Sequence, residues 1–167
     1  MSINFFKENC KSSANQIKFG IYDAEDNTPA RIVFEREEDW NAIVLNDNSV
    51  EILFIAIDHC VEIIDDNGNQ ESSCDAALYY ANTLLFIELK NKRASWQIEG
   101  LTQIESTIIK MQNTESDFYN SFSKKIAIVA NRKHKFPCFH EQAHSLREFF
   151  YKKYKARIQL AATIKIE

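Results

Sequence analysis

The chain has 167 residues, of which 45% are hydrophobic and 26% charged, a composition typical of one folded globular domain and not of a disordered chain. Three glycines and two prolines leave no glycine-rich phosphate-binding loop, and the short apolar runs leave no transmembrane helix and no secretory signal. The net charge of −4 is unevenly distributed: 21 acidic and 9 basic residues lie up to position 120, and 3 acidic and 11 basic residues follow. The C-terminal part can therefore offer a basic surface to a polyanion or form a solvated face.

The N-terminal part of the chain contains short elements joined by polar turns. Residues 3–15 are expected to form a short helix. The expected strands are residues 19–22, 31–35, 40–45, 50–57 and 61–64. The polar turn Asn46–Ser49 predicts a β-hairpin between the strands on either side of it, and Asn67-Gly68 is a strong turn signal after the last strand. These elements predict a β-hairpin and helix elaboration before the core.

The C-terminal part contains longer elements with clear periodicity. The expected strands are residues 74–80, 83–90, 125–130 and 158–166. Apolar residues recur at helical spacing and predict helices at 96–111 and 140–154. The order strand, strand, helix, strand, helix, strand predicts an α/β fold with a mixed central sheet flanked by helices.

The hairpin expected at residues 74–90 carries the strongest candidate site. If Ala81-Asn82 forms a two-residue turn, Asp75 lies opposite Glu88. Side chains alternate along a strand, so Lys90 points to the same face as Glu88. A register slip of one residue would turn Asp75 to the other face. The sequence therefore predicts that two carboxylates and one amine converge at the end of the hairpin.

Two facing carboxylates repel each other, so a cation between them is expected. Lys90 can supply part of the compensation, and a divalent metal ion, Mg²⁺ or Mn²⁺, can supply more. A nearby lysine would then orient a water molecule or stabilise an anionic transition state, as metal-assisted hydrolysis of a phosphodiester requires. The alternative is a structural ion pair of Lys90 with Glu88 or Asp75, and spacing alone does not separate the two interpretations.

Asp75, twelve intervening residues, then Glu88-Leu89-Lys90 at the end of an apolar strand resembles the PD-(D/E)XK, or restriction-endonuclease-like, nuclease superfamily. Gln103 matches a glutamine that many members carry on the following helix. The resemblance implies that Asp75 and Glu88 bind the metal ion, with the backbone carbonyl of Leu89 as a further ligand. It also implies that Lys90 acts on the attacking water or the scissile phosphate and that Gln103 positions water or substrate.

The resemblance covers about residues 50–130, and the C-terminal helix and strand would extend the core to about 50–167 of a single domain, residues 1–167. Two features depart from the family pattern. Cys74 stands where the family has a proline, which has no chemical role. Many members also carry a glutamate on an earlier helix, and no residue here is its clear counterpart. The candidates for this third carboxylate are Glu8, Glu38, Asp58 and Glu62.

Other groups invite weaker hypotheses. Residues 140–144 match the letters HExxH of zinc hydrolases, with Glu141 as base, but no third ligand is apparent, so helix-surface histidines are the favoured interpretation. The aromatic cluster at 149–151 could stack on bases, although core packing is the default expectation. The basic residues expected to contact a phosphate backbone are Arg132, Lys133, Lys135, Lys152 and Lys153.

The four cysteines show no CxxC spacing, which argues against a zinc site. They are Cys10, Cys60, Cys74 and Cys138. An intracellular chain of this size needs no disulfides. All four are therefore expected to be buried, reduced thiols in a cytoplasmic protein.

Together these features predict a divalent-metal-dependent nuclease that hydrolyses phosphodiester bonds in DNA, located in the cytoplasm, with Mg²⁺ or Mn²⁺ as cofactor and no contact with membranes. A chain of 167 residues has little room for a sequence-reading module, so a homodimer or a protein partner would supply any specificity. The alternative is a catalytically inactive member of the same fold that acts as a protein-interaction module. An immunity or regulatory protein of this kind could bind a basic partner through its acidic first 120 residues.

Overall fold

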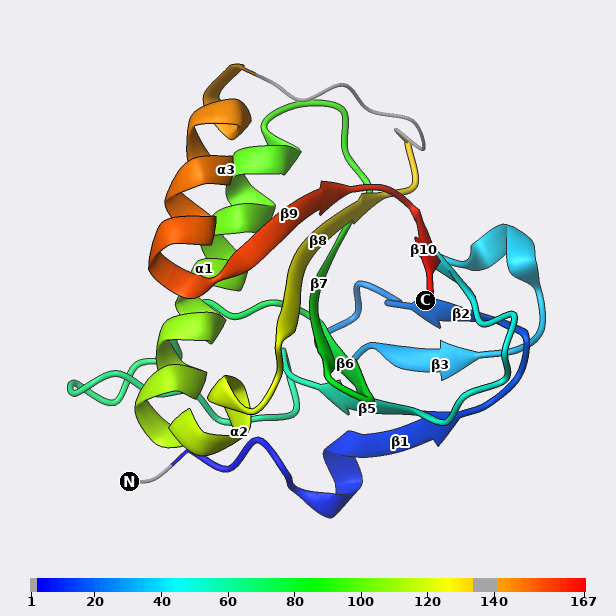
Figure 1. Ribbon diagram of the computed structural model, residues 1–167, viewed down its shortest axis with the longest axis horizontal. Helices are drawn as coiled ribbons and strands as arrows, with labels where there is room; N and C mark the ends of the chain where they lie inside the picture. Colours follow the sequence, from blue (N-terminus) through cyan, green and yellow to red (C-terminus); the bar gives the residue numbers. More distant parts are fainter. Residues whose placement is uncertain (1–2, 134–140) are drawn as a thin grey trace.

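The computed structural model of the protein describes residues 3–133 and 141–167, without the side chains of residues 141–144. Within this described part, two β-sheets lie face to face, and three helices cover the outer face of the larger sheet (Figure 1). The fold is therefore mixed α/β, as the order of elements in the sequence predicts.

The larger sheet has the strand order β1-β5-β6-β7-β8-β9. Its strands are β1 (Lys11–Ala14), β5 (Ile52–Ala56), β6 (Ala76–Tyr80), β7 (Thr83–Lys90), β8 (Lys124–Asn131) and β9 (Ala156–Leu160). Neighbours from β1 to β7 are antiparallel, whereas β8 runs parallel to β7 and β9 runs parallel to β8. An antiparallel meander is thus followed by two parallel strands.

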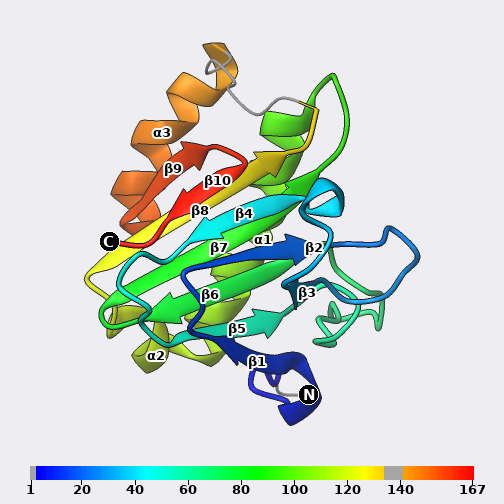
Figure 2. The same ribbon diagram turned by 90° about the vertical axis from the view of Figure 1, so that its right-hand side faces the viewer.

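The smaller sheet has the strand order β10-β4-β2-β3 and lies over the larger one (Figure 2). Its strands are β2 (Lys18–Tyr22), β3 (Arg31–Val33), β4 (Ala42–Leu45) and β10 (Thr163–Lys165). β10 is parallel to β4, and the other pairs are antiparallel. This sheet is built from the N-terminal part of the chain and its last strand, so the two ends of the sequence meet in one layer.

The helices are α1 (Trp96–Thr114), α2 (Ser116–Asn120) and α3 (Glu141–Tyr154), and two 3-10 turns are η1 (Glu8–Cys10) and η2 (Glu37–Asp39). α1 packs on β7 and β8, and α3 packs on β9. The apolar stripe of α1 is buried, as its spacing predicts. No described helix is long and apolar enough to cross a membrane.

Alternation along β7 divides the buried side chains into two layers. Leu84 and Phe86 face the helices, whereas Leu85 and Ile87 face the smaller sheet. Continuing this alternation places Glu88 on the helix side, where it approaches α1. The candidate site therefore lies between the larger sheet and α1.

Three expected elements of the N-terminal part are wrong. Residues 3–15 do not form a helix, because the chain after η1 pairs with β5 as the edge strand β1. Residues 61–64 form no strand but one isolated bridge, Ile64 to Gln70, although the turn at Gly68 is present with φ +83°. The hairpin expected around Asn46–Ser49 does not form either, because β4 and β5 lie in different sheets.

The last expected strand, residues 158–166, is two strands in the structure. β9 ends at Leu160, and the chain then crosses to the smaller sheet as β10. Backbone hydrogen bonds fix this crossing on both sides: Ile43 N donates to Ala162 O at 2.8 Å, and Ile166 N donates to Leu45 O at 2.9 Å. One apolar run therefore serves both sheets.

The expectation that all four cysteines are reduced is wrong. Cys10 and Cys60 form a disulfide across 50 positions of sequence, because the pairing of β1 with β5 brings the residue before β1 beside the turn after β5. Cys74 is a buried free thiol, and Cys138 lies outside the described residues. The cytoplasmic location stays a prediction. The disulfide does not favour it, because disulfides are rare in the cytosol.

Candidate active site

The β6–β7 hairpin has the register predicted from the sequence. Ala81 takes a left-handed conformation with φ +46° in the two-residue turn, and the ladder runs from Tyr80–Thr83 to Ala76–Ile87. Asp75 lies one step beyond the ladder. Its backbone N–H donates to Glu88 Oε2 at 3.2 Å, and its Oδ2 accepts a hydrogen bond from Leu89 N at 2.7 Å. These two bonds hold the carboxylates side by side.

Lys90 and Gln103 complete the cluster. Lys90 Nζ lies 3.0 Å from Glu88 Oε1 and donates a hydrogen bond to Gln103 Oε1. Gln103, on α1, also donates from Nε2 to the backbone oxygen of Ser73 at 3.4 Å. The structure therefore brings together Asp75, Glu88, Lys90 and Gln103, and both polar atoms of the glutamine are engaged with protein groups.

Two residues of α1 hold this helix against the site. At Gly100 a Cβ atom would lie 2.6 Å from Val129 Cγ1 and 3.4 Å from Glu88 Cγ, so the helix can approach this closely only without a side chain there. One turn after Gln103, Thr107 Oγ1 accepts a hydrogen bond from Cys74 N at 2.8 Å. α1 is thus tied to the backbone that precedes Asp75.

Burial dominates the electrostatics of the two carboxyl groups. Asp75 is 8% exposed, and burial raises its pKa to about 7, although the hydrogen bond from Leu89 N lowers the pKa and the charges of Asp23 and Asp58 raise it. Glu88 is 3% exposed, and burial and then the charge of Asp75 raise its pKa well above the usual range, against the opposing effect of Lys90. A second cation beside the pair would stabilise the ionised form of both groups.

Among the four candidates for the third carboxylate, Asp58 is the one whose charge raises the pKa of both Asp75 and Glu88. Its backbone N–H donates to Cys74 O at 3.2 Å, and its Oδ1 accepts a hydrogen bond from Ser73 Oγ at 3.4 Å. The carboxylate is a third exposed and also lies 3.2 Å from His59 Nε2. Asp58 thus stands at the solvent side of the cluster.

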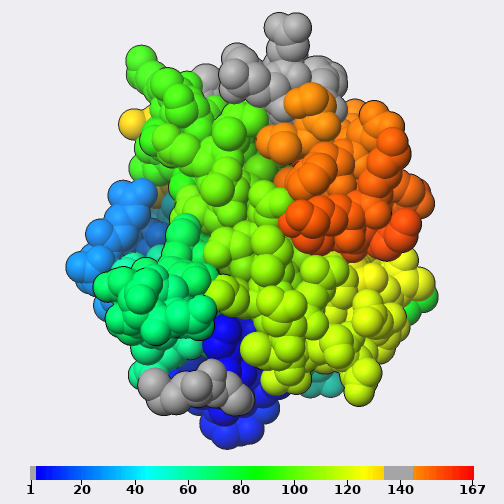
Figure 3. Space-filling view, turned by 90° about the vertical axis from the view of Figure 1, so that its left-hand side faces the viewer, coloured from blue at the N-terminus to red at the C-terminus, as the bar shows by residue number. Residues whose placement is uncertain are grey.

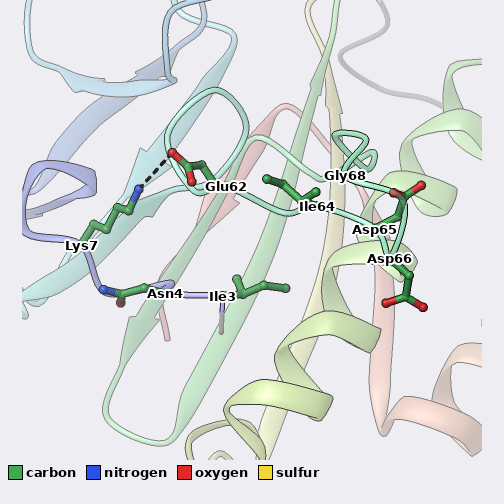
Figure 4. Close-up of a pocket in the computed structure, with 8 residues that line it drawn as sticks. All are labelled: Ile3, Asn4, Lys7, Glu62, Ile64, Asp65, Asp66 and Gly68. Atoms are coloured by element: carbon green, nitrogen blue, oxygen red, sulfur yellow. Dashed lines mark ion pairs between the residues drawn. The ribbon is translucent and has the colours of Figure 1, made fainter. Parts of the chain in front are cut away.

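The other three candidates have different surroundings. Glu8 pairs with Lys11 at 2.8 Å, and Glu62 lies 3.8 Å from Lys7 at a hollow near the N-terminus (Figure 4). Glu38 belongs to η2, where its backbone oxygen accepts a hydrogen bond from Arg132. Asp58, and none of these three carboxylates, is among the leading causes of the raised pKa values of Asp75 and Glu88.

Sequence reasoning missed Asp23. This residue follows β2 in the smaller sheet, and its backbone N–H donates to Asn41 Oδ1 at 2.9 Å. Its charge nevertheless raises the pKa of Asp75. The only signal in the sequence is an acid directly after a strand, which many surface residues share, so the packing of two sheets was needed to find it.

The residues present fit a divalent metal ion. Carboxylate oxygens are the donors that Mg²⁺ and Mn²⁺ prefer, and Mg²⁺ commonly takes one or two carboxylates and keeps several water molecules. Asp75 and Glu88 supply such a pair. Among the residues whose side chains are described, no group of three or more His, Cys, Asp or Glu side chains is arranged to hold a metal ion. Water and substrate would therefore complete the shell.

The basic residues expected to contact a phosphate backbone are divided between two ends of the larger sheet. Arg132 and Lys133 directly follow Asn131, which pairs with Lys90, so they lie at the end of the sheet where the site is. Lys152 and Lys153 lie in the last turn of α3, next to the start of β9 at the opposite end. Lys135 lies outside the described residues, as do His140 and the side chains of the rest of the HExxH segment.

Comparisons of the chain with protein-family models, with curated proteins and with solved structures find no match. What the geometry defines is a mixed α/β protein with two buried carboxylates, a lysine and a glutamine gathered where one strand end meets a helix.

Proposed function

We propose that the protein is a divalent-metal-dependent nuclease of the restriction-endonuclease-like class, which hydrolyses phosphodiester bonds in DNA with Mg²⁺ or Mn²⁺. One observation carries the proposal. Asp75 and Glu88 are held side by side in a buried position, with Lys90 Nζ 3.0 Å from Glu88 on the same face of the sheet. Two adjacent carboxylates can hold a divalent ion that activates water, and an amine beside them can stabilise the charge on a phosphate.

The topology around the site supports the same class. The antiparallel meander β5-β6-β7 is followed by α1 and then by β8, which runs parallel to β7. An antiparallel meander, then a helix, then a parallel strand is also the core of the restriction-endonuclease-like nucleases that the sequence resembles. The site lies at the end of β7, where the chain leaves the sheet to enter α1 (Figure 1).

Each side chain then has a role that its contacts support. Asp75 and Glu88 would hold the ion, which when bound supplies an activated water and positive charge at the scissile phosphate. Lys90, whose side chain is 14% exposed, can direct its ammonium group at the charge that develops on the phosphate. Gln103 accepts a hydrogen bond from Lys90, so it is a positioning residue that fixes the ammonium group.

The test is incubation of the protein with plasmid DNA and Mg²⁺ or Mn²⁺, with EDTA as the metal-free control. We expect cleavage by the wild type, and a loss of at least about a hundredfold in Asp75→Ala, Glu88→Ala and Lys90→Ala, because each removes a group that acts on the transition state. Circular dichroism establishes that the variants are folded. Cleavage that continues in all three variants, or a wild type without cleavage, would contradict the proposal.

One observation favours a second function, a protein-interaction module with an inactive site. The carboxylates of Asp75 and Glu88 each accept a hydrogen bond from a neighbouring backbone N–H, as structural carboxylates do. In that case no DNA is cut, and Mg²⁺ does not stabilise the wild type against urea. Cleavage and the effect of Mg²⁺ on stability therefore separate the two functions.

A further inference from the structure

The end of α3 and the start of β9 form a basic surface away from the candidate active site. α3 lies beside α1 on one face of the molecule in the space-filling view (Figure 3, orange beside green). Between positions 145 and 157 the cationic residues are Arg147, Lys152, Lys153, Lys155 and Arg157. One acid, Glu148, lies among them and pairs with Lys152 at 2.7 Å. The surface therefore keeps a clear excess of positive charge, which suits a polyanion.

An open hollow in this surface is lined by Arg147, Tyr151, Arg157 and Ile158. Arg147 and Tyr151 lie one helical turn apart on α3, and the other two come from β9, the edge strand of the larger sheet. Guanidinium groups present a planar fork of N–H donors that matches the oxygens of a phosphate. The two arginines thus give the hollow N–H donors suited to a phosphate group, beside the apolar surface of Tyr151 and Ile158.

Exposed aromatic rings accompany these cations. Tyr151 is 52% exposed and Phe149 is 40% exposed. Lys155 Nζ lies 5.9 Å from the ring centroid of Tyr151, and Lys153 Nζ lies 5.2 Å from that of Phe149. Cations beside partly exposed ring faces are typical of surfaces that bind single-stranded nucleic acid, where bases stack and phosphates pair. An acidic peptide would use the cations but not the ring faces.

The hollow is well separated from the candidate active site. Lys90 pairs with Asn131 at one end of β8, whereas Ala156, next to Arg157, pairs with Lys125 at the other end. Arg157 itself pairs with Ile126, and the five steps from Ile126 to Asn131 span about 17 Å at roughly 3.3 Å per residue. One nucleic-acid strand of moderate length can reach both places, whereas a mononucleotide cannot.

We propose that Arg147, Tyr151 and Arg157 form a binding site for the phosphate backbone of a DNA strand, distinct from the centre at Asp75 and Glu88. The identity of this strand as the substrate rests on the proposed nuclease function. The binding itself rests on the charge, the guanidinium groups and the exposed ring of this surface.

The test is fluorescence anisotropy with a labelled single-stranded DNA oligonucleotide in EDTA, so that no cleavage occurs. Arg147→Gln with Arg157→Gln is expected to weaken binding about tenfold and to reduce the slope of log K against log salt concentration by about 1.4, or 0.7 for each lost phosphate contact. Tyr151→Ala is expected to weaken it further through lost stacking. The matched control removes two exposed cations elsewhere, Lys18→Gln with Lys165→Gln, and should leave the affinity within about twofold.

The outcomes separate this inference from the proposed function. Unchanged affinity and salt slope in the double arginine variant overturn the inference, whether or not the wild type cuts DNA. Weakened binding in that variant, with a wild type that never cuts, supports the inference and counts against the nuclease. Polyglutamate that binds as tightly as DNA and loses its affinity in the same variant would identify an acidic protein as the partner and overturn the proposal.

Discussion

Gly100 decides how closely a helix can approach the candidate site. Glycine in a helix interior normally costs about 1 kcal/mol relative to alanine. Here a methyl group would lie 2.6 Å from Val129 Cγ1 and would touch the side chain of Glu88, so overpacking replaces the usual gain. The residue is therefore required by the packing of α1 against β7 and β8.

We expect Gly100→Ala to lower the free energy of unfolding by about 1–3 kcal/mol, because the helix has to shift away from the sheet. The same shift moves Gln103 away from Lys90, so cleavage should fall as well. Urea denaturation measures the stability. The second substitution Val129→Ala makes room for the methyl group and should recover most of the loss, whereas a single variant more stable than the wild type would show that the contact is not limiting.

Single residues also show why part of the site could be predicted from the sequence. Asp75, Glu88 and Lys90 belong to one hairpin whose turn sets the register locally, so alternation alone brings them together. Gln103 follows on the next helix. Asp23 acts on Asp75 from the other sheet, and no local pattern indicates which acid of a remote strand will lie nearby.

At the scale of whole elements, turn residues predict where the chain bends. They do not predict which strands pair with each other. Asn46 makes the expected turn, since its side chain donates to Val50 O at 2.8 Å and accepts from Val50 N at 3.1 Å. The strands on either side nevertheless enter different sheets. The hairpin of β6 and β7 was predictable because both of its strands are continuous apolar runs around a two-residue turn.

The disulfide is a link between elements that sequence spacing could not indicate. Cys10 precedes the short edge strand β1, and Cys60 lies in the turn after β5, where Ile57 N donates to Asp75 O at 2.9 Å. Closing a loop of this length restricts the unfolded chain. The bond therefore stabilises both the edge of the sheet and the turn that carries Asp58.

We expect reduction with dithiothreitol to lower the free energy of unfolding by about 2–4 kcal/mol. Denaturation in urea with and without the reductant measures the change. In the variant with both Cys10→Ser and Cys60→Ser, the reductant should have no effect. Equal stability of the oxidised and reduced wild type would mean that the link does not constrain the chain.

The whole molecule has three layers, and its chemistry is divided between the two ends of the larger sheet. The end formed by Lys90 and Asn131 gathers the carboxylates, and the end formed by Lys125 and Ala156 carries the basic surface. The smaller sheet covers the other face and adds the charge of Asp23. Because two carboxyl groups, Asp75 and Glu88, are buried together at one end of the sheet, the stability of the entire fold depends on pH.

The free energy of unfolding of the metal-free protein should fall as the pH rises. Folding raises the pKa of Asp75 from its ordinary 3.8 to about 7, so the folded state holds this proton more tightly than the unfolded chain. Its contribution is fully present below pH 3.8 and is lost as the pH rises through about 7. Glu88 acts in the same direction, because its pKa is also raised.

Urea denaturation in EDTA at a series of pH values from 5 to 8.5 measures this effect. We expect Asp75→Asn to become the more stable protein toward the alkaline end, whereas the exposed control Asp47→Asn should follow the wild type throughout. Mg²⁺ added at pH 8 should restore the wild type and not Asp75→Asn, since an ion that binds only the folded state adds to its stability. Parallel pH profiles for wild type and Asp75→Asn would mean that the buried pair is not held as a like-charged cluster.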